Sequence, residues 1–146
     1  MNKNLHNKLN EYLANQQIMY IKLHNLHWYV KGRSFFTLHV KLEELYDQTA
    51  EIIDDVAERL LALGGTPVAS VKKALSIASV KELEDTAISS DDTVKALISD
   101  VDYWIHDTKE IVKLAEEDDD GPTADLFTGY LGEYQKLLWM LNAYMG

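Results

Sequence analysis

The stretch FFTLHVKLEELYDQTAEIIDDVAERLLAL, residues 35–63, decides the fold of this chain. It contains no Gly or Pro, and its apolar residues recur every three or four positions, so it predicts one long helix. At about 100° per residue, one side of that helix carries an apolar stripe suited to a protein core. The stripe comprises Leu38, Leu42, Leu45, Thr49, Ile52, Ile53, Val56, Leu60 and Leu63.

A third side of the same helix, apart from the core stripe and a charged solvent side, mixes acids and a histidine with small and apolar residues. A solvent-facing side is usually polar throughout, so the mixture indicates a face that packs against another surface. The side carries His39, Glu43, Asp54 and Glu58, interleaved with Tyr46, Ala50, Ala57 and Leu61.

The spacing of the four ligand-type residues predicts a metal site shared between two chains. His39 and Glu43 are one helical turn apart and can bind one ion, and the same holds for Asp54 and Glu58. From Glu43 to Asp54 the helix rises by roughly 16 Å, so one helix cannot bring both pairs to one ion. A second, antiparallel copy about a two-fold axis near residues 48–49 can, and it gives two identical sites per dimer.

The helix before this one brings a further histidine to the same level. Residues 5–30 have helical apolar spacing, and residues 31–34 interrupt it with Gly32 as a C-terminal cap and Ser34 as an N-cap for the next helix. So short a loop makes the two helices antiparallel neighbours. His27 and His39 lie about equally far from that turn. His27 is therefore a candidate third ligand.

The remaining chain predicts a second helical hairpin after a long connection. Gly64 and Gly65 end the central helix, and the segment Asp118–Pro122 separates the last two helices. The predicted fold class is all-α, a ferritin-like four-helix bundle with one long crossover that contains a short helix, in a single domain over residues 1–146. The expected later elements are a short helix at 71–77, a helical turn at 81–86, and helices at about 92–117 and 123–144.

Composition excludes several classes of function. The 146 residues include no cysteine, which excludes disulfides, thiolate zinc sites and thiol catalysis. The polar start lacks a signal peptide's apolar segment, and no apolar run has membrane-spanning length, so a soluble cytoplasmic protein is expected. The net charge of −10 argues against a general nucleic-acid binder. It fits a protein that attracts cations, or one that simply stays soluble.

Several motifs together resemble the Dps family of miniferritins. They are HNLHWYVKG at 24–32, FFTLH at 35–39, EELY at 43–46, Asp54, and AER at 57–59, and the resemblance runs to KLLW at 136–139. It implies a dodecameric, hollow homo-oligomer built on two-fold dimers. It further implies a ferroxidase, an oxidoreductase that binds ferrous iron between subunits, oxidises it preferably with hydrogen peroxide, stores ferric mineral and so protects against oxidative damage.

The resemblance also implies roles for individual residues. His27, His39 and Glu43 match the ligands that one subunit supplies, and Asp54 and Glu58 match those of its partner. The two acids would anchor Fe(II), while Glu43 would be a weak second-position ligand or would orient His39 or a bridging water. Zinc is expected to compete with iron, because the general affinity order of divalent metals does not favour iron.

Two further features follow from the resemblance. Trp28 adjoins a ligand and is expected to be an electron donor near the metal or else a packed interface aromatic. Acids at the turn into the last helix line an iron-entry pore in the family. Asp119, Asp120 and Asp125 are the candidates here, with Asp118 beside them, although acids at this place also suit a helix N-terminus.

Other interpretations of the same residues lead to different tests. Taken alone, each acid or histidine pair on the central helix is typical of a solvated surface, and His24 is expected to make a structural hydrogen bond. The five ligand-type residues together favour a metal site over a bundle without metal. DNA compaction, the activity behind the family's name, is the alternative function. It is less favoured because the tail before the first helix offers only Lys3, with Lys8 just inside the helix.

Overall fold

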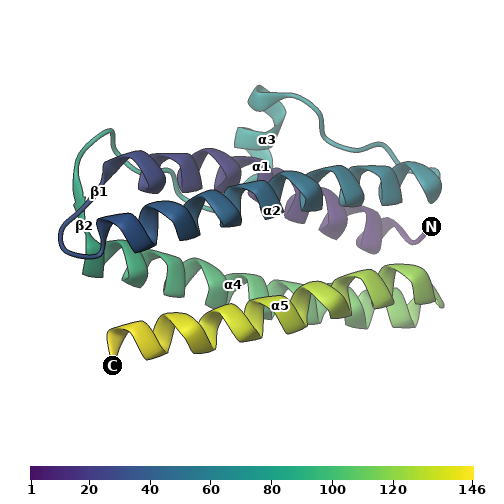
Figure 1. Cartoon of the computed structure of the whole chain (residues 1–146). Coiled ribbons are helices and arrows are strands. Elements are labelled where there is room, and N and C mark those ends of the chain that lie inside the picture. Colours follow the sequence, from purple (N-terminus) through teal and green to yellow (C-terminus); the bar gives the residue numbers. More distant parts are fainter. The chain divides into compact units, whose positions relative to one another are not determined.

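The computed structural model describes all 146 residues and contains five helices and one pair of two-residue strands (Figure 1). The elements are α1 (Lys3–Tyr29), β1 (Val30–Lys31), α2 (Phe35–Ala62), α3 (Val71–Ile77), β2 (Ile88–Ser89), α4 (Ser90–Glu117) and α5 (Gly121–Met145). All the predicted helices are confirmed, with ends that shift by one or two residues at most. None of the five helices combines the length and the apolar composition that a membrane span requires.

The predicted helical turn at residues 81–86 is wrong. This stretch has no helical or strand structure apart from a bend. Its backbone is held from outside instead, since the side-chain amide of Asn25 on α1 donates a hydrogen bond to the carbonyl of Glu84 at 3.0 Å. The same carbonyl also accepts a hydrogen bond from the backbone amide of Thr86 at 2.9 Å, which spans two residues and is not the i to i+4 bond of a helix.

The chain forms two compact units. One unit is Leu9–Thr93, and the other combines Met1–Lys8 with Val94–Gly146. The first contains nearly all of α1, the whole of α2 and the crossover with α3. The second contains most of α4 and the whole of α5. Every predicted metal ligand lies in the first unit.

The turn between α1 and α2 is closed by a short parallel strand pair. β1 pairs with β2, with Val30 opposite Ile88 and Lys31 opposite Ser89. Gly32 follows with a φ of 114°, which disfavours a side chain, and a Cβ there would meet the Ser90 hydroxyl at 3.0 Å. Ser34 occupies the N-cap of α2 as predicted, although its side chain makes no capping hydrogen bond. This turn sets α1 and α2 antiparallel, side by side.

Side-chain amides on α1 hold the crossover in place. Asn10 donates to the carbonyl of Thr66 and accepts from the amide of Val68, at 2.9 and 2.8 Å. Asn15, fully buried, accepts from the backbone amides of Ser79 and Val80 at 2.7 and 2.9 Å. The irregular backbone between α2 and α4 is thus satisfied by α1, which leaves it little need for secondary structure of its own.

The core stripe of α2 is largely as predicted. Most of its residues are buried, while Ile53 and Leu63 are half-buried. The helix ends in a Schellman motif, in which Gly64 has a φ of 81° and the amide of Gly65 donates to the carbonyl of Leu60 at 2.8 Å. The predicted glycine stop is confirmed. The buried residues of the stripe are Leu38, Leu42, Leu45, Thr49, Ile52, Val56 and Leu60.

In the second unit, one acidic turn ends α4 and begins α5. Asp119 adopts a left-handed φ of 55°, and the amide of Asp120 donates to the carbonyl of Ala115 at 2.8 Å. Asp120 then caps α5, since its carboxylate accepts hydrogen bonds from the backbone amide and hydroxyl of Thr123 at 3.2 and 2.5 Å. Trp104 and Tyr134 stack between the two helices, with ring centroids 6.3 Å apart.

Candidate metal centre

The α1–α2 turn brings two imidazoles into face-to-face contact. The rings of His27 and His39 stack with centroids 3.7 Å apart and planes 11° apart. Each ring is also hydrogen-bonded to the backbone of the other residue. Nδ1 of His27 lies 2.7 Å from the carbonyl oxygen of His39, and Nδ1 of His39 lies 2.8 Å from the carbonyl oxygen of His27. A carbonyl oxygen only accepts, so both Nδ1 atoms carry the donated proton. In the neutral rings, both Nε2 lone pairs are then available to a metal.

Glu43 lies at the edge of this histidine pair. One of its carboxylate oxygens is 3.9 Å from Nε2 of His27, which is too long for a hydrogen bond but short enough for a shared ligand or water. His27 is buried, whereas the Glu43 side chain is 57% exposed. The carboxylate can therefore approach an ion bound at His27 from the solvent side.

Tyr46 packs against the same pair, and no role was assigned to it from the sequence. Its ring meets that of His27 edge to face at 5.3 Å and stacks on His24 at 3.8 Å. Burial raises the pKa of the Tyr46 phenol, as do the charges of Glu43 and Asp47 and a hydrogen bond with Glu43. Its spacing of three residues after Glu43, on the ligand side of the helix, was the available signal.

The second predicted pair lies further along α2. Asp54 and Glu58 are both exposed. A hydrogen bond with Asp54, the charge of Asp54, some burial and the charge of Asp55 raise the pKa of the Glu58 carboxyl. Two carboxylates this close repel when both are ionised, and either a proton or a cation relieves the repulsion. Their donor chemistry fits a hard or borderline divalent cation.

One chain alone does not assemble a complete metal site. Nowhere in it do three His, Cys, Asp or Glu side chains converge closely enough to hold an ion. Of the five predicted ligands, the structure groups His27 with His39 and Glu43 on one side and Asp54 with Glu58 on the other. The first group supplies two imidazole nitrogens beside an exposed carboxylate, and the second supplies two carboxylates that remain accessible.

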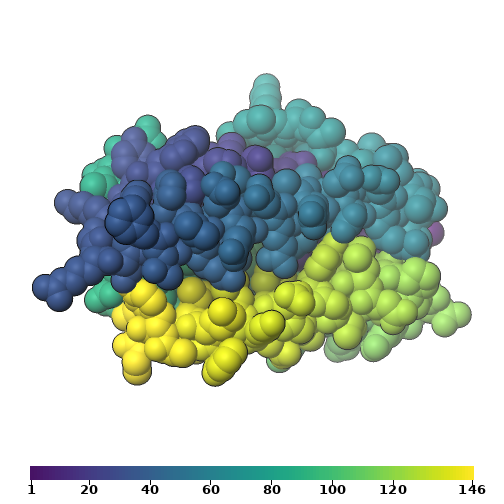
Figure 2. Space-filling model, in the orientation of Figure 1, coloured from purple at the N-terminus to yellow at the C-terminus, as the bar shows by residue number.

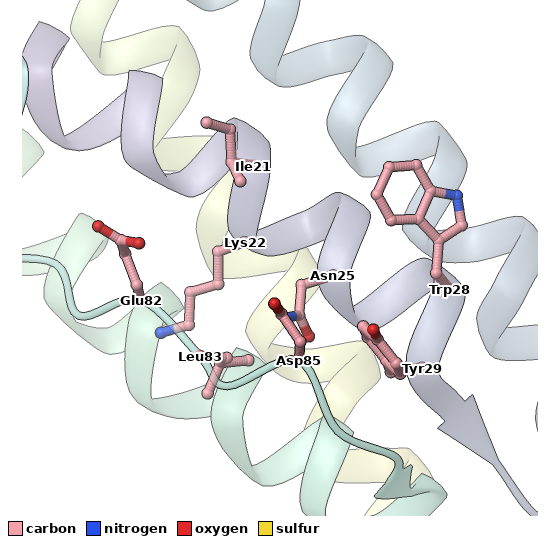
Figure 3. A pocket seen from close by; sticks show the side chains of 8 residues that line it. All are labelled: Ile21, Lys22, Asn25, Trp28, Tyr29, Glu82, Leu83 and Asp85. Carbon is pink, nitrogen blue, oxygen red and sulfur yellow. The ribbon is translucent and has the colours of Figure 1, made fainter. Parts of the chain in front are cut away.

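Trp28 follows His27 on α1 and projects from the unit. Its side chain is 67% exposed, and its ring lies 5.4 Å from that of His24. It also borders a hollow of about 340 Å³ between α1 and the crossover, where Lys22 extends toward the segment that carries Glu82, Leu83 and Asp85 (Figure 3). Because Trp28 is not packed within the chain, both predicted roles stay open. The other residues of the hollow are Ile21, Asn25 and Tyr29.

His24 makes the structural hydrogen bond expected of it. Its Nδ1 lies 2.8 Å from the carbonyl oxygen of Tyr20, one turn back on α1. The ring is thereby oriented between Tyr20 and Tyr46, with centroids 4.7 and 3.8 Å away. His24 thus supports Tyr46, which in turn contacts His27.

The predicted pore acids differ in their surroundings. Asp119 and Asp125 are exposed, whereas Asp120 is buried and its carboxylate caps α5. Asp118 accepts a hydrogen bond from the backbone amide of Asn2 at 3.1 Å. Only Asp119 and Asp125 therefore present carboxylates that are both exposed and not engaged in a hydrogen bond within the unit.

Three comparisons relate the chain to known proteins. A family model described as a ferritin-like domain matches residues 6–146. General stress protein 20U of Bacillus subtilis is 44% identical over 146 residues and 100% of both chains, and DNA protection during starvation protein 2 of Bacillus anthracis is 42% identical over 145 residues and 99% of both. The solved Dps structure from Vibrio cholerae O1, described as a ferritin-like diiron-carboxylate protein, has a TM-score of 0.93 at 36% identity and covers 99% of this chain and 90% of its own. The predicted fold class is confirmed.

Proposed function

The chain belongs to the Dps family of ferritin-like proteins, and from that premise we propose that it is a miniferritin that oxidises Fe(II) at sites shared between two subunits. The single observation that supports the proposal is the reciprocal hydrogen bonding of His27 and His39 through Nδ1, which leaves both Nε2 atoms available to a metal.

In the proposed site, each subunit supplies one half of the ligands. His27, His39 and Glu43 come from one chain, and Asp54 and Glu58 come from the partner. Two imidazoles with carboxylates suit Fe(II), and the carboxylates stabilise the Fe(III) that forms. Zinc should compete for the same ligands. The hydrogen bonds from both Nδ1 atoms hold the rings in one tautomer, which pre-orients the nitrogens for the ion.

The proposed reaction consumes ferrous iron and hydrogen peroxide. Two Fe(II) ions each give up one electron, the O–O bond of the peroxide breaks, and two Fe(III) ions and two hydroxides result. Ferric iron is then stored as mineral inside a hollow dodecamer of the chain. In this reading Asp119 and Asp125 line the entry route, while Asp120 serves as the cap of α5. Trp28 would either donate an electron to oxidising species near the site or pack as an aromatic residue at the subunit interface.

The test is ferrous oxidation by the full chain with hydrogen peroxide, followed by the absorbance of ferric product. The variant D54A/E58A removes both partner ligands and should abolish rapid oxidation. The variant E51A/D55A is the matched control, because both residues are exposed acids one turn apart on α2 and the charge change is the same. Equal rates for D54A/E58A and wild type would contradict the proposal.

The names of the relatives supply a second function to test, DNA binding. The chain's net charge of −10 opposes it, since binding to phosphates depends on clustered Lys and Arg. Plasmid retention in a gel shift at low salt and without magnesium would establish it. We expect free migration of the plasmid.

A further inference from the structure

A groove runs along α1 between this helix and the crossover, and it consists of two hollows. The first hollow, of about 340 Å³, lies beside residues 82–85 (Figure 3). The second hollow, of about 200 Å³, lies where α3 begins, and Figure 2 shows α3 in teal projecting beside the purple atoms of α1. The side chain of Ile21, which is 58% exposed, lines both hollows, so they adjoin one another. We call the two together the α1 groove.

The two hollows differ in charge. Lys22, Glu82 and Asp85 line the first, so one cation stands against two anions. No charged side chain lines the second. Its walls are apolar, or polar without charge, and they comprise Gln17, Ile18, Ala69, Ser70, Val71 and Ala74 beside Ile21. The α1 groove is therefore acidic at one end and apolar at the other.

The acids of the first hollow are available to a ligand. Glu82 and Asp85 are both exposed, and neither takes part in an ion pair or a side-chain hydrogen bond. Lys22 is only 7% exposed and forms part of the wall. The segment that carries the two acids is fixed in place, because Asn25 on α1 donates a hydrogen bond to the carbonyl of Glu84 at 3.0 Å. The hollow is thus formed before a ligand arrives, which lowers the cost of binding.

We infer that the α1 groove binds an organic ammonium ion that carries an apolar chain. The ammonium lies at Glu82 and Asp85, and the chain passes over Ile21 into the second hollow. The carboxylates attract the cation, and the aromatic rings of Trp28 and Tyr29 at the same hollow favour it further. Burial of the chain removes apolar surface of both the ligand and the protein from water.

Other classes of ligand fit the α1 groove less well. A carboxylate or a phosphate would meet two acids and a single buried amine, so its charge would be repelled. A metal ion would leave the apolar hollow unused, and an uncharged apolar compound would leave the acids without a partner. Along α1 the groove extends from residue 17 to residue 29, roughly 18 Å of helical rise, so a chain of several carbons has room.

The experiment is a calorimetric titration of the full-length protein with n-alkylamines, from butylamine to octylamine, at low ionic strength and neutral pH. We expect saturable binding of one ion per chain, and the Kd should fall by about two- to fourfold for each added methylene until the second hollow is filled. Octanol should bind about fivefold more weakly than octylamine, and octanoate more weakly still. Octanoate that binds as tightly as octylamine, or octylamine uptake that does not saturate, overturns the inference.

One pair of variants tests the acidic end of the α1 groove. E82Q/D85N should weaken octylamine binding about fivefold and leave octanol binding unchanged. The control E51Q/D55N removes the same charge from two exposed acids on α2 and should leave the binding of both compounds unchanged. Equal octylamine affinity of E82Q/D85N and E51Q/D55N overturns the inference.

A second pair of variants tests the apolar end. Val71 lines the second hollow and is 68% exposed, so V71S should fold normally and should weaken octylamine binding about threefold while butylamine binding changes little. V40S is the matched control, because Val40 is an exposed valine on α2 outside the groove. Circular dichroism verifies that all four variants are helical. Equal octylamine affinity of V71S and V40S also overturns the inference.

Discussion

His27 and His39 hold one another through both their rings and their backbones, with 3.7 Å between ring centroids and one Nδ1-to-carbonyl hydrogen bond in each direction. Replacement of either residue therefore removes one proposed ligand and the hydrogen bond that orients the other. We expect H27A and H39A each to lower Co(II) affinity by about 10- to 100-fold, and the double variant to lose little more than the worse single. The check is a spectroscopic Co(II) titration, with exposed His106→Ala as the control.

The Asp54–Glu58 pair predicts a pH dependence of the metal-free chain. Asp54 raises the pKa of Glu58 above its ordinary value of 4.5. The folded chain then holds more protons than the unfolded chain just above pH 4.5, so the contribution of Glu58 to stability falls as pH rises through that window. E58Q should flatten this part of the Tm-against-pH curve measured in chelator. The control E51Q should leave it unchanged. A wild-type curve that rises more steeply there than that of E58Q would contradict the assignment.

We expect Tyr46 to affect the two proposed metal positions to different extents. Its hydroxyl interacts with Glu43, while its ring supports His27. Y46F keeps the ring and loses the hydroxyl, so we expect several-fold weaker binding of the second Co(II) ion and little change in the first. Tyr20→Phe, whose ring lies 6.2 Å from that of Tyr46, is the control. Equal weakening of both positions would point to a general packing defect instead.

The hydrogen bonds of Asn15 to the crossover are expected to contribute to the unfolding free energy. Its buried carboxamide accepts hydrogen bonds from the amides of Ser79 and Val80. N15A leaves these groups without their partner, which should cost about 2–3 kcal/mol of unfolding free energy. Asn25→Ala loses a single hydrogen bond, to the carbonyl of Glu84, which is more exposed than those of Asn15. The expected cost is therefore below about 1 kcal/mol of unfolding free energy. Urea denaturation of both variants gives the comparison, and a cost for N25A as large as that for N15A would be inconsistent with it.

The acids at the α4–α5 turn predict two separable effects. D120A removes the cap of α5 and should cost about 1–2 kcal/mol, without a specific effect on iron entry. D125A should leave the Tm nearly unchanged and slow iron uptake by the assembled shell, because Asp125 is exposed. Uptake by D125A that matches wild type would remove Asp125 from the proposed entry route.

Much of the fold could be predicted because helices depend on local spacing. The core stripe of α2 and its glycine stop follow from a 3.6-residue period and from the ease with which Gly adopts positive φ. Residues 81–86 were assigned wrongly for the complementary reason. The Glu84 carbonyl in this stretch accepts a hydrogen bond from the side chain of Asn25, which lies on α1 far away in the sequence, so no local pattern indicates it.

The candidate site likewise has a part that local spacing predicts and a part that only tertiary contacts determine. Spacing along one helix was enough to group His39 with Glu43 and Asp54 with Glu58. The helical rise between the two pairs also showed that one helix cannot bring both to the same ion. The cap that Asp120 forms with Thr123 is a local contact, in keeping with the preference of helix N-termini for acids. Which nitrogen each imidazole leaves for a metal and the contact of Tyr46 with His27 depend on groups that meet across a turn or between helices. Such contacts arise from the directions in which elements pack, and a linear pattern holds the period of a helix but not the direction of its neighbour.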